Sequence, residues 1–268
     1  MRLKFKQGEA LDKAISSDRL QTYLNEAHND VRLARALYVW DRDLAAAVFA
    51  DIAVIEVALR NAIHRELSNE YGPRWYDTGG LPLDDRETST LRRTWDELPG
   101  HVKQHPGSPD VPGRLVARFM FGFWRNLFDA GAYLGKAPRK VRVNYDDNWR
   151  DALHKVFPGG KAEARRQGVQ YTRDWALKQV SIVHALRNRV GHHEPLVRGL
   201  PLPGQGQPRL TASQCHEACL RLARMLDRDL AEWLQRNSSV RSLLEARPAH
   251  VRRPVGRLRL RIGRLPRA

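Results

Sequence analysis

The stretch from Leu44 to Leu67 constrains the fold more than any other part of the sequence. It is rich in Ala, Leu, Val and Ile and contains neither Gly nor Pro. This composition predicts one long helix that is buried along much of its length. Asp51 and Glu56 interrupt its most apolar part, so the stretch is interpreted as a core helix and not as a membrane span.

Apolar residues recur at helical spacing on both sides of this stretch, and no segment makes a convincing strand. The predicted class is therefore all-α, with one helical bundle as the main body. A kink or short turn is expected at Trp40 and Asp41, and a break near Gly168. The other predicted helices cover residues 18–28, with Ser17 as the N-cap, 31–38, 84–98, 112–128, 145–156, 161–190, 212–234 and 237–246.

The helical part is predicted to form one domain, residues 1–246, within which residues 1–100 are a helical subregion. The remaining 22 residues, 247–268, carry 8 Arg and no acid, together with three prolines and two glycines. They are predicted to form a disordered basic tail. Arg257, Arg259 and Arg261 alternate with apolar residues in this tail and are candidate RNA-binding residues.

The charge of the chain is strongly positive. Lys and Arg number 46 against 30 acidic residues, which gives a formal net charge of +16, and 37 of the 46 are Arg. A guanidinium can bind a phosphate through two parallel hydrogen bonds, which a Lys ammonium cannot do. The balance predicts a phosphate-bearing partner such as RNA, with a general preference for Arg in the source proteome as the alternative.

The sequence carries no recognisable signal for export or for membrane insertion. The amino-terminal residues include no apolar run long enough for a signal peptide, so a cytoplasmic protein with no membrane partner is predicted. Cys215 and Cys219 are the only cysteines and lie four apart in a predicted helix, where a disulfide is geometrically poor. They are expected to be buried thiols. With too few ligands near them for zinc, neither a metal nor a cofactor is predicted.

The most informative segment lies where the helix over residues 161–190 is expected to stop. Gly191 can adopt the left-handed conformation of a helix cap, and Pro195 cannot continue a helix. In an unbroken helix Arg187 and His192 would lie about 140° apart around the axis. We expect the break at Gly191 to let the His192 imidazole swing back beside the Arg187 guanidinium.

These side chains suit metal-independent cleavage of RNA, in which a 2′-hydroxyl attacks its own phosphate. His192 can act as base or acid, Arg187 can stabilise the developing charge, and Asn188 can orient the phosphate or the imidazole. One His per chain is short of two proton-transfer groups, so a symmetric homodimer is predicted. Arg189 and His193, spaced four apart, are an alternative pair that spacing alone does not exclude.

A purely structural interpretation is also open, because Arg and His near a helix carboxyl terminus are stabilised by the helix dipole. The sequence itself, however, resembles a known family at this point. The string LRNRVGHHEPL, residues 186–196, resembles the LRNxxxHHEP signature of Abi-like (abortive infection) proteins of the HEPN superfamily. Shorter pieces agree in order over residues 17–234, namely LYVWD at 37–41, IEVALRNAI at 55–63 and FGFW at 121–124.

The resemblance implies a HEPN-like helical bundle with additional helices, often dimeric, and a metal-independent ribonuclease centre. It places Arg187 and His192 in the R-x-x-x-x-H positions and Asn188 at the polar position. It also implies a role in phage defence or in a toxin–antitoxin system, with an antitoxin as a further partner. Some members of the superfamily only bind nucleic acid, so a non-catalytic RNA-binding or regulatory module is the alternative. The Arg-rich tail is not part of the pattern.

A second polar series lies within the long predicted helix. Glu56, Arg60 and His64 are spaced four apart and share one face. One interpretation is a structural ion pair between Glu56 and Arg60, because charges in an apolar stretch must be paired. The other is a second wall of the RNA site, with Arg60 or His64 facing Arg187. The further supporting residues of this prediction are His193 and Glu194, and Arg189 is a further RNA-binding candidate.

Overall fold

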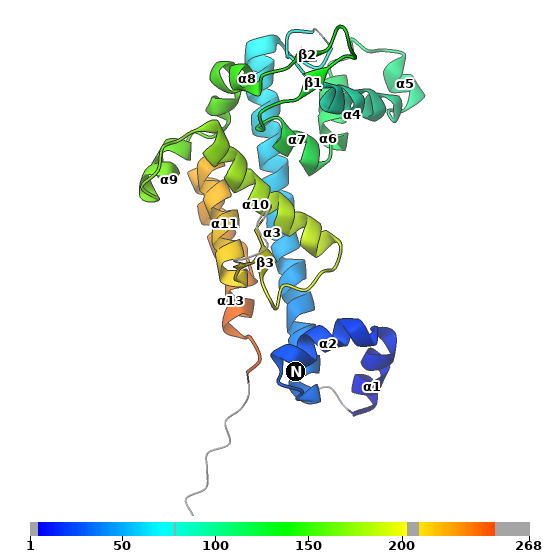
Figure 1. Cartoon of the computed structure of the whole chain (residues 1–268), viewed down its shortest axis with the longest axis vertical. Coiled ribbons are helices and arrows are strands. Elements are labelled where there is room, and N and C mark those ends of the chain that lie inside the picture. Colours follow the sequence, from blue (N-terminus) through cyan, green and yellow to red (C-terminus); the bar gives the residue numbers. More distant parts are fainter. Residues whose placement is uncertain (1–4, 78, 203–208, 250–268) are drawn as a thin grey trace, which may run out of the picture. The chain divides into compact units, whose positions relative to one another are not determined.

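The computed structural model describes residues 5–77, 79–202 and 209–249 (Figure 1). This part of the chain is mostly helical, which confirms the predicted all-α character. Its α-helices are α1 (Phe5–Ala14), α2 (Ser17–Glu26), α3 (Val31–Tyr71), α4 (Asp85–Asp96), α5 (Gly100–Lys103), α6 (Val111–Arg118), α7 (Phe121–Asn126), α8 (Tyr145–Asp151), α9 (Gly160–Arg166), α10 (Arg173–Gly191), α11 (Ala212–Leu226), α12 (Arg228–Asn237) and α13 (Val240–Glu245). A short 3-10 helix, η1 (Leu153–Val156), follows α8.

Two short hairpins correct the expectation that the chain has no strands. Strand β1 (Tyr133–Leu134) pairs antiparallel with β2 (Val141–Arg142), and β3 (Leu200–Pro201) pairs with β4 (Arg209–Leu210). Each strand has two residues. A period of two residues cannot be recognised in so short a segment, which is why the sequence pattern did not reveal them.

The described residues fall into two compact units, and the division lies inside α3. Residues up to Tyr38, together with those from Arg247 on, form the first unit, and Val39–Ala246 form the second. In the first unit the Ser16 side chain accepts a hydrogen bond from the Arg19 amide and caps α2, so the cap lies one residue before the predicted Ser17. An ion pair between Arg35 and Asp12 joins α3 to α1.

Helix α3 supplies the central part of the core of the second unit. Its buried residues recur at helical spacing along one face, and several of them have no exposed surface: Leu44, Ile52, Ile55, Leu59, Ile63 and Leu67. The helix runs without interruption through Trp40 and Asp41, so the kink expected there does not form. Instead the Trp40 indole donates to the Leu243 carbonyl at 2.6 Å, and both carboxylate oxygens of Asp41 accept from the Leu196 amide at 3.1 Å.

Three of the helices expected from the sequence are each divided into two α-helices. The one predicted over residues 212–234 is α11 followed by α12, with Asp227 extended between them. The helix predicted over residues 161–190 is α9 followed by α10, and Gly168 between them has φ +68°. The apolar segment after Pro112 breaks between α6 and α7 at Phe119 and Met120, which are both extended.

In the second unit α11 packs against α10 (Figure 1) and also against α12. Cys215 and Cys219 lie on α11 as buried free thiols, as expected. Burial raises the pKa of Cys215 to about 11 and that of Cys219 further still, so both thiols stay protonated at neutral pH. No helix in the described part of the chain is both long and apolar enough to cross a membrane.

Candidate functional site at the carboxyl end of helix α10

Helix α10 ends in a Schellman motif, and the left-handed residue is a histidine. The His193 amide donates to the Val190 carbonyl at 3.1 Å, and the Glu194 amide donates to the Arg189 carbonyl at 2.8 Å. These are the two bonds that define this kind of helix end. His193 has φ 57°, whereas Gly191 is the last residue of the helix. The prediction that Gly191 adopts the left-handed cap is therefore wrong.

The position of this cap determines how Arg187 and His192 are directed. Because α10 stays helical through Gly191, and His192 follows with φ −91° and ψ 10°, the two side chains leave the helix about 140° apart. His192 and His193 are both exposed, and neither imidazole has a hydrogen-bond or ion-pair partner among the described residues. The Arg187 side chain runs toward the end of the helix, since its Nη1 lies 3.9 Å from the position that a Cβ on Gly191 would take.

Arg187 lies beside Glu56 of α3. Its Nε is 3.8 Å from Oε2 of Glu56, and the two side chains are 27% and 21% exposed. This distance is too long for a hydrogen bond, and the Arg187 Nε is buried with no hydrogen-bond partner among the described atoms. Burial raises the pKa of Glu56, while the charges of Arg187 and Arg60 lower it. The guanidinium is thus neutralised electrostatically but keeps an unused N–H donor.

Arg60 does not form the ion pair with Glu56 that the i, i+4 spacing suggested. Its Nη1 donates to the carbonyl of Ala117, in the last turn of α6, at 3.4 Å. Its Nε is buried without a hydrogen-bond partner among the described atoms. The guanidinium is therefore drawn toward a backbone carbonyl of another helix, and the ion pair of Glu56 is made with Arg187. Glu56 and Arg60 nevertheless both lie close to the α10 site.

His64, the third member of that series, belongs to different surroundings. Its Nδ1 accepts a hydrogen bond from Nε1 of Trp75 at 2.9 Å, and the Ser68 hydroxyl lies 3.3 Å from the same nitrogen. Burial lowers the pKa of His64, which keeps the imidazole neutral as an acceptor. Trp75 and Trp124 are core residues, 1% and 0% exposed. His64 therefore supports the aromatic core and does not face Arg187.

Arg189 and Glu194 fasten the turn that follows α10. The Arg189 Nε donates to the Pro195 carbonyl at 2.7 Å, and its Nη1 donates to the Glu194 carboxylate at 3.0 Å. The Arg189 side chain is only 14% exposed, and burial lowers its pKa. Both residues act on the turn itself, so Arg187 is the guanidinium with the greater freedom to meet a phosphate.

His184 is a site residue that the sequence argument missed. Nδ2 of Asn188 lies 3.3 Å from Nε2 of His184, and this contact is a hydrogen bond when Nε2 carries no proton. Burial, then the charges of Arg125 and Arg187, lowers the pKa of His184. The imidazole is neutral and fixes the Asn188 amide. The spacing along the sequence could have indicated this contact, because His184 precedes Asn188 by four residues on the same helix.

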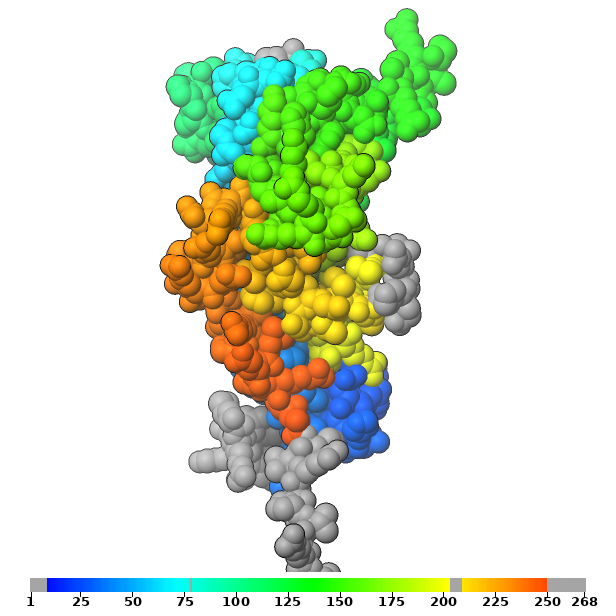
Figure 2. Space-filling model, turned by 90° about the vertical axis from the view of Figure 1, so that its left-hand side faces the viewer, coloured from blue at the N-terminus to red at the C-terminus, as the bar shows by residue number. Residues whose placement is uncertain are grey.

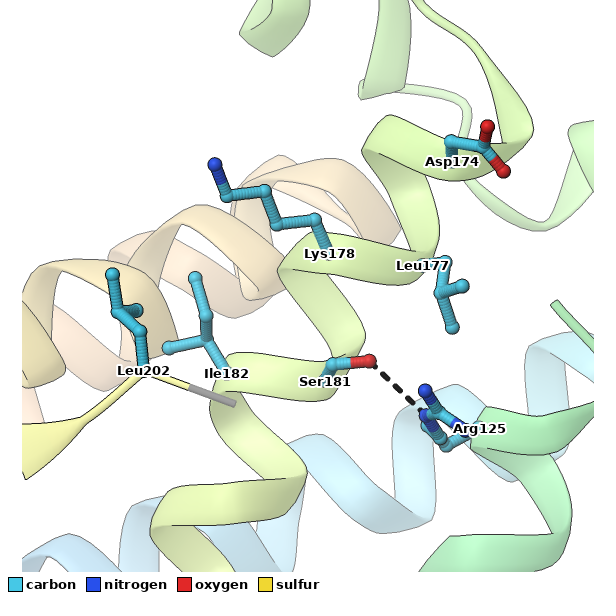
Figure 3. A pocket seen from close by; sticks show the side chains of 7 residues that line it. All are labelled: Arg125, Asp174, Leu177, Lys178, Ser181, Ile182 and Leu202. Carbon is cyan, nitrogen blue, oxygen red and sulfur yellow. Dashed lines mark hydrogen bonds between the residues drawn. The ribbon is translucent and has the colours of Figure 1, made fainter. Parts of the chain in front are cut away.

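A small surface pocket lies along the same helix and is drawn in Figure 3. Nε of Arg125 donates to the Ser181 hydroxyl at 3.1 Å, while the ends of Lys178 and Asp174 point away from this pair (Figure 3). The pocket volume is about 220 Å³, below the range typical of small-molecule sites. Its lining residues are Arg125, Asp174, Leu177, Lys178, Ser181, Ile182 and Leu202.

The pocket and the end of α10 share one side of the helix. Ser181 and His192 are eleven residues apart, which is about three turns, so they project in nearly the same direction. The exposed imidazole therefore continues the face that carries the Arg125 and Ser181 contact. Arg257, Arg259 and Arg261, the predicted RNA-binding residues of the tail, lie outside the described residues.

Comparison with known proteins gives no relative: no family model, no curated protein and no solved structure matches the chain. The resemblance to Abi-like proteins remains a prediction that is based on the string over residues 186–196 and the shorter pieces before it.

Proposed function

We propose that this chain is a cytoplasmic, metal-independent endoribonuclease of the Abi-like, HEPN type, acting as the effector of a phage-defence or toxin–antitoxin system. The observation that carries the proposal is the end of α10. Two exposed imidazoles, His192 and His193, follow a guanidinium at Arg187 whose side chain is 27% exposed. Such a set of cation and neutral-pH acid–base groups suits attack on a ribose phosphate.

In the proposed reaction the 2′-hydroxyl oxygen attacks the adjacent phosphorus, and the bond from phosphorus to the 5′-oxygen breaks. A base removes the 2′ proton, and an acid gives a proton to the leaving 5′-oxygen. The products are a 2′,3′-cyclic phosphate and a 5′-hydroxyl end. His192 serves as one of the two proton-transfer groups, Arg187 binds the non-bridging oxygens, and Asn188, held by His184, orients the phosphate.

The proposal requires a homodimer. Within one chain the side chains of Arg187 and His192 leave the helix about 140° apart, which does not favour binding of one phosphate by both. In a two-fold dimer the partner's His192 would complete the site beside Arg187 and supply the second proton-transfer group. Dimerisation would thus both unite the charged and the titratable groups and provide a means of control, including by an antitoxin that covers the same surface.

The left-handed conformation of His193 supports a use for its imidazole. A non-glycine residue with positive φ is energetically unfavourable, and such residues often occur at functional sites. Glycine at this position would make the same Schellman motif without that cost. His193 is therefore retained as a supporting group, and single substitutions decide whether it or His192 transfers the proton.

The test is an RNA cleavage assay in EDTA, with analysis of the product ends. Wild-type protein is expected to leave cyclic phosphate ends, and His192→Ala and Arg187→Ala are expected to keep the fold and to lose at least about 100-fold in rate. His101→Ala, at an exposed histidine of the second unit, is the matched control. Equal cleavage by His192→Ala and the control would refute the assigned role, and loss only in His193→Ala would move it to His193.

A second candidate, a non-catalytic RNA-binding module, is favoured by one observation. Glu56 neutralises Arg187, and His192 lies on another side of the helix. This alternative predicts binding of RNA that weakens with salt but yields no product. Removal of residues 247–268 should then reduce the salt dependence. Sedimentation of a dimer with no RNA cleavage at any protein concentration would favour this alternative over the nuclease.

A further inference from the structure

We infer that the β1–β2 hairpin, residues 132–143, is an RNA-binding arm of the protein. The inference rests on the proposed action on RNA, but it requires only binding and not cleavage. The hairpin carries four cations and no acidic residue, and all of the residues from Tyr133 to Arg142 are exposed. In Figure 2 it is the green projection at the upper right of the molecule. The cations are Lys136, Arg139, Lys140 and Arg142.

The charges of the hairpin are free to bind an external anion. None of its four cationic side chains forms an ion pair in the part of the chain that the structure describes. The Asp85 carboxylate accepts from the backbone amide of Gly135 at 3.1 Å and forms no ion pair with the cationic side chains of the hairpin among the described residues. Most other exposed Arg side chains of this unit pair with an Asp or Glu, as Arg228 and Arg236 do with Glu232. Unpaired surface cations in such density fit a polyanion.

One face of the hairpin also offers an aromatic ring. Tyr133 is 48% exposed and pairs across the strands with Arg142, so both side chains project from the same face. The Lys140 ammonium lies 4.0 Å from the centre of the Tyr133 ring. An exposed ring among cations is the combination that single-stranded RNA requires, because bases stack on the ring while cations bind the backbone.

The other face carries Leu134 and Val141, which are paired across the strands and exposed. These aliphatic side chains could instead enter a membrane surface. Together they have fewer carbon atoms than one myristoyl chain, and a single myristoyl chain gives only marginal membrane binding. The density of charge and the aromatic ring therefore favour RNA as the partner.

The base of the hairpin is held firmly, so the arm presents its groups in a fixed direction. Gly131 lies so close to the opposite strand that a Cβ would be 2.3 Å from the Val143 carbonyl. Nη1 of Arg173, at the start of α10, donates to the Phe128 carbonyl at 2.9 Å and so connects the segment before the hairpin to this helix. The 19 residues of α10 span about 28 Å, a length that roughly eight nucleotides cover at the spacing of a stacked duplex strand. One RNA strand could thus reach from the arm to His192.

The experiment measures binding of a fluorescent single-stranded RNA about 16 nucleotides long, in EDTA, over a range of salt concentrations. Every ribose carries a 2′-O-methyl group, so that the probe cannot be cleaved. The test variant combines Lys136→Gln, Arg139→Gln and Arg142→Gln and leaves Lys140 over Tyr133. The matched control removes the same charge elsewhere in the unit through Arg228→Gln, Arg236→Gln and Arg241→Gln. Circular dichroism and thermal melting establish that each variant is folded.

The hairpin variant is expected to bind about 100-fold more weakly at 0.1 M salt and to lower the salt slope by about 2, since each lost phosphate contact on a single strand contributes about 0.7. Tyr133→Leu, which keeps all charges, is expected to weaken binding about tenfold. An equal loss on DNA of the same sequence would support contact with the backbone. Equal effects of the hairpin and control variants would overturn the inference, as would loss of binding to anionic vesicles with RNA binding unchanged.

The two proposals fail in different ways. If wild-type protein leaves ordinary RNA intact but the hairpin variant loses affinity for the methylated probe, the nuclease proposal is wrong and the arm is supported. If wild-type protein cleaves RNA and the hairpin variant binds the methylated probe as tightly as wild type, the arm is refuted and the nuclease proposal stands. Absence of any RNA binding by wild-type protein would overturn the inference about the arm.

Discussion

Two histidines at the end of α10, His192 and His193, should respond in opposite ways to replacement by glycine. His193→Gly should stabilise the protein, and His192→Gly should destabilise it. His193 has φ 57°, a conformation that glycine adopts without steric cost, whereas His192 has φ −91° and ψ 10° and gains nothing from glycine. Both imidazoles are exposed and have no hydrogen-bond partner among the described residues. The two substitutions therefore differ mainly in backbone conformation, and each serves as the control for the other.

The magnitude follows from the backbone. Relief of a left-handed conformation contributes roughly 1–2 kcal/mol, and the greater freedom of glycine in the unfolded chain returns part of it. His193→Gly should raise the free energy of unfolding by about 1 kcal/mol. His192→Gly has no strain to relieve and should lower the free energy of unfolding by about 0.5–1 kcal/mol. For a unit of this size 1 kcal/mol corresponds to a change in Tm of about 2–4 °C.

Urea denaturation followed by circular dichroism measures both free energies, and a thermal melt gives an independent ranking. A destabilised His193→Gly protein would refute the reasoning, because it would mean that the imidazole makes contacts that outweigh the backbone strain. The His193→Gly protein should also be tested in the RNA cleavage assay. A gain in stability together with a loss of cleavage would show that the strained residue is kept for its side chain.

Two further predictions concern buried polar groups of the second unit. Asp41 is 3% exposed and binds the Leu196 amide through both carboxylate oxygens, so Asp41→Ala should lower the free energy of unfolding by about 2–3 kcal/mol, and a loss below 0.5 kcal/mol in urea denaturation would contradict this. The pKa of His184 is lowered by burial from its ordinary 6.5, so its contribution to stability is complete above pH 6.5 and is lost as the pH falls through the folded-state pKa. The slope of unfolding free energy against pH below 6.5 should therefore be smaller in His184→Gln, by up to about 1.4 kcal/mol per pH unit, and an unchanged slope would disprove it.

Much of the helical framework could be predicted from the sequence because the signals are local. The run from Leu44 to Leu67 has helical spacing and no helix breaker, and it lies within α3. The breaks were harder. Gly168 is a residue type that predicts a break in a helix. Phe119 and Met120 are not helix-breaking residue types, so their extended conformation depends on tertiary packing, which local sequence does not reveal. Trp40 and Asp41 were misread for the same reason, since their partners Leu243 and Leu196 are far away in the chain.

The candidate site was predicted only in part. The choice of Arg187, Asn188 and His192 came from their order along the chain, but side-chain direction depends on which residue takes the left-handed cap. Glycine is the usual choice, and the chain uses His193 instead. The pairing of Glu56 with Arg187 joins α3 to α10 and cannot be inferred from i, i+4 spacing. The β1–β2 hairpin could not be predicted, because two residues per strand are too few to show the alternation of apolar and polar residues that is typical of a strand.

The fastening of the turn after α10 has a thermodynamic consequence for any ligand that binds there. The guanidinium of Arg189 holds the Pro195 carbonyl and the Glu194 carboxylate, while the Glu194 amide returns to the helix. The backbone that carries His192 and His193 is thus ordered before a ligand arrives. Little backbone entropy remains to be lost on association, so the cost of binding there is limited to the ordering of the side chains.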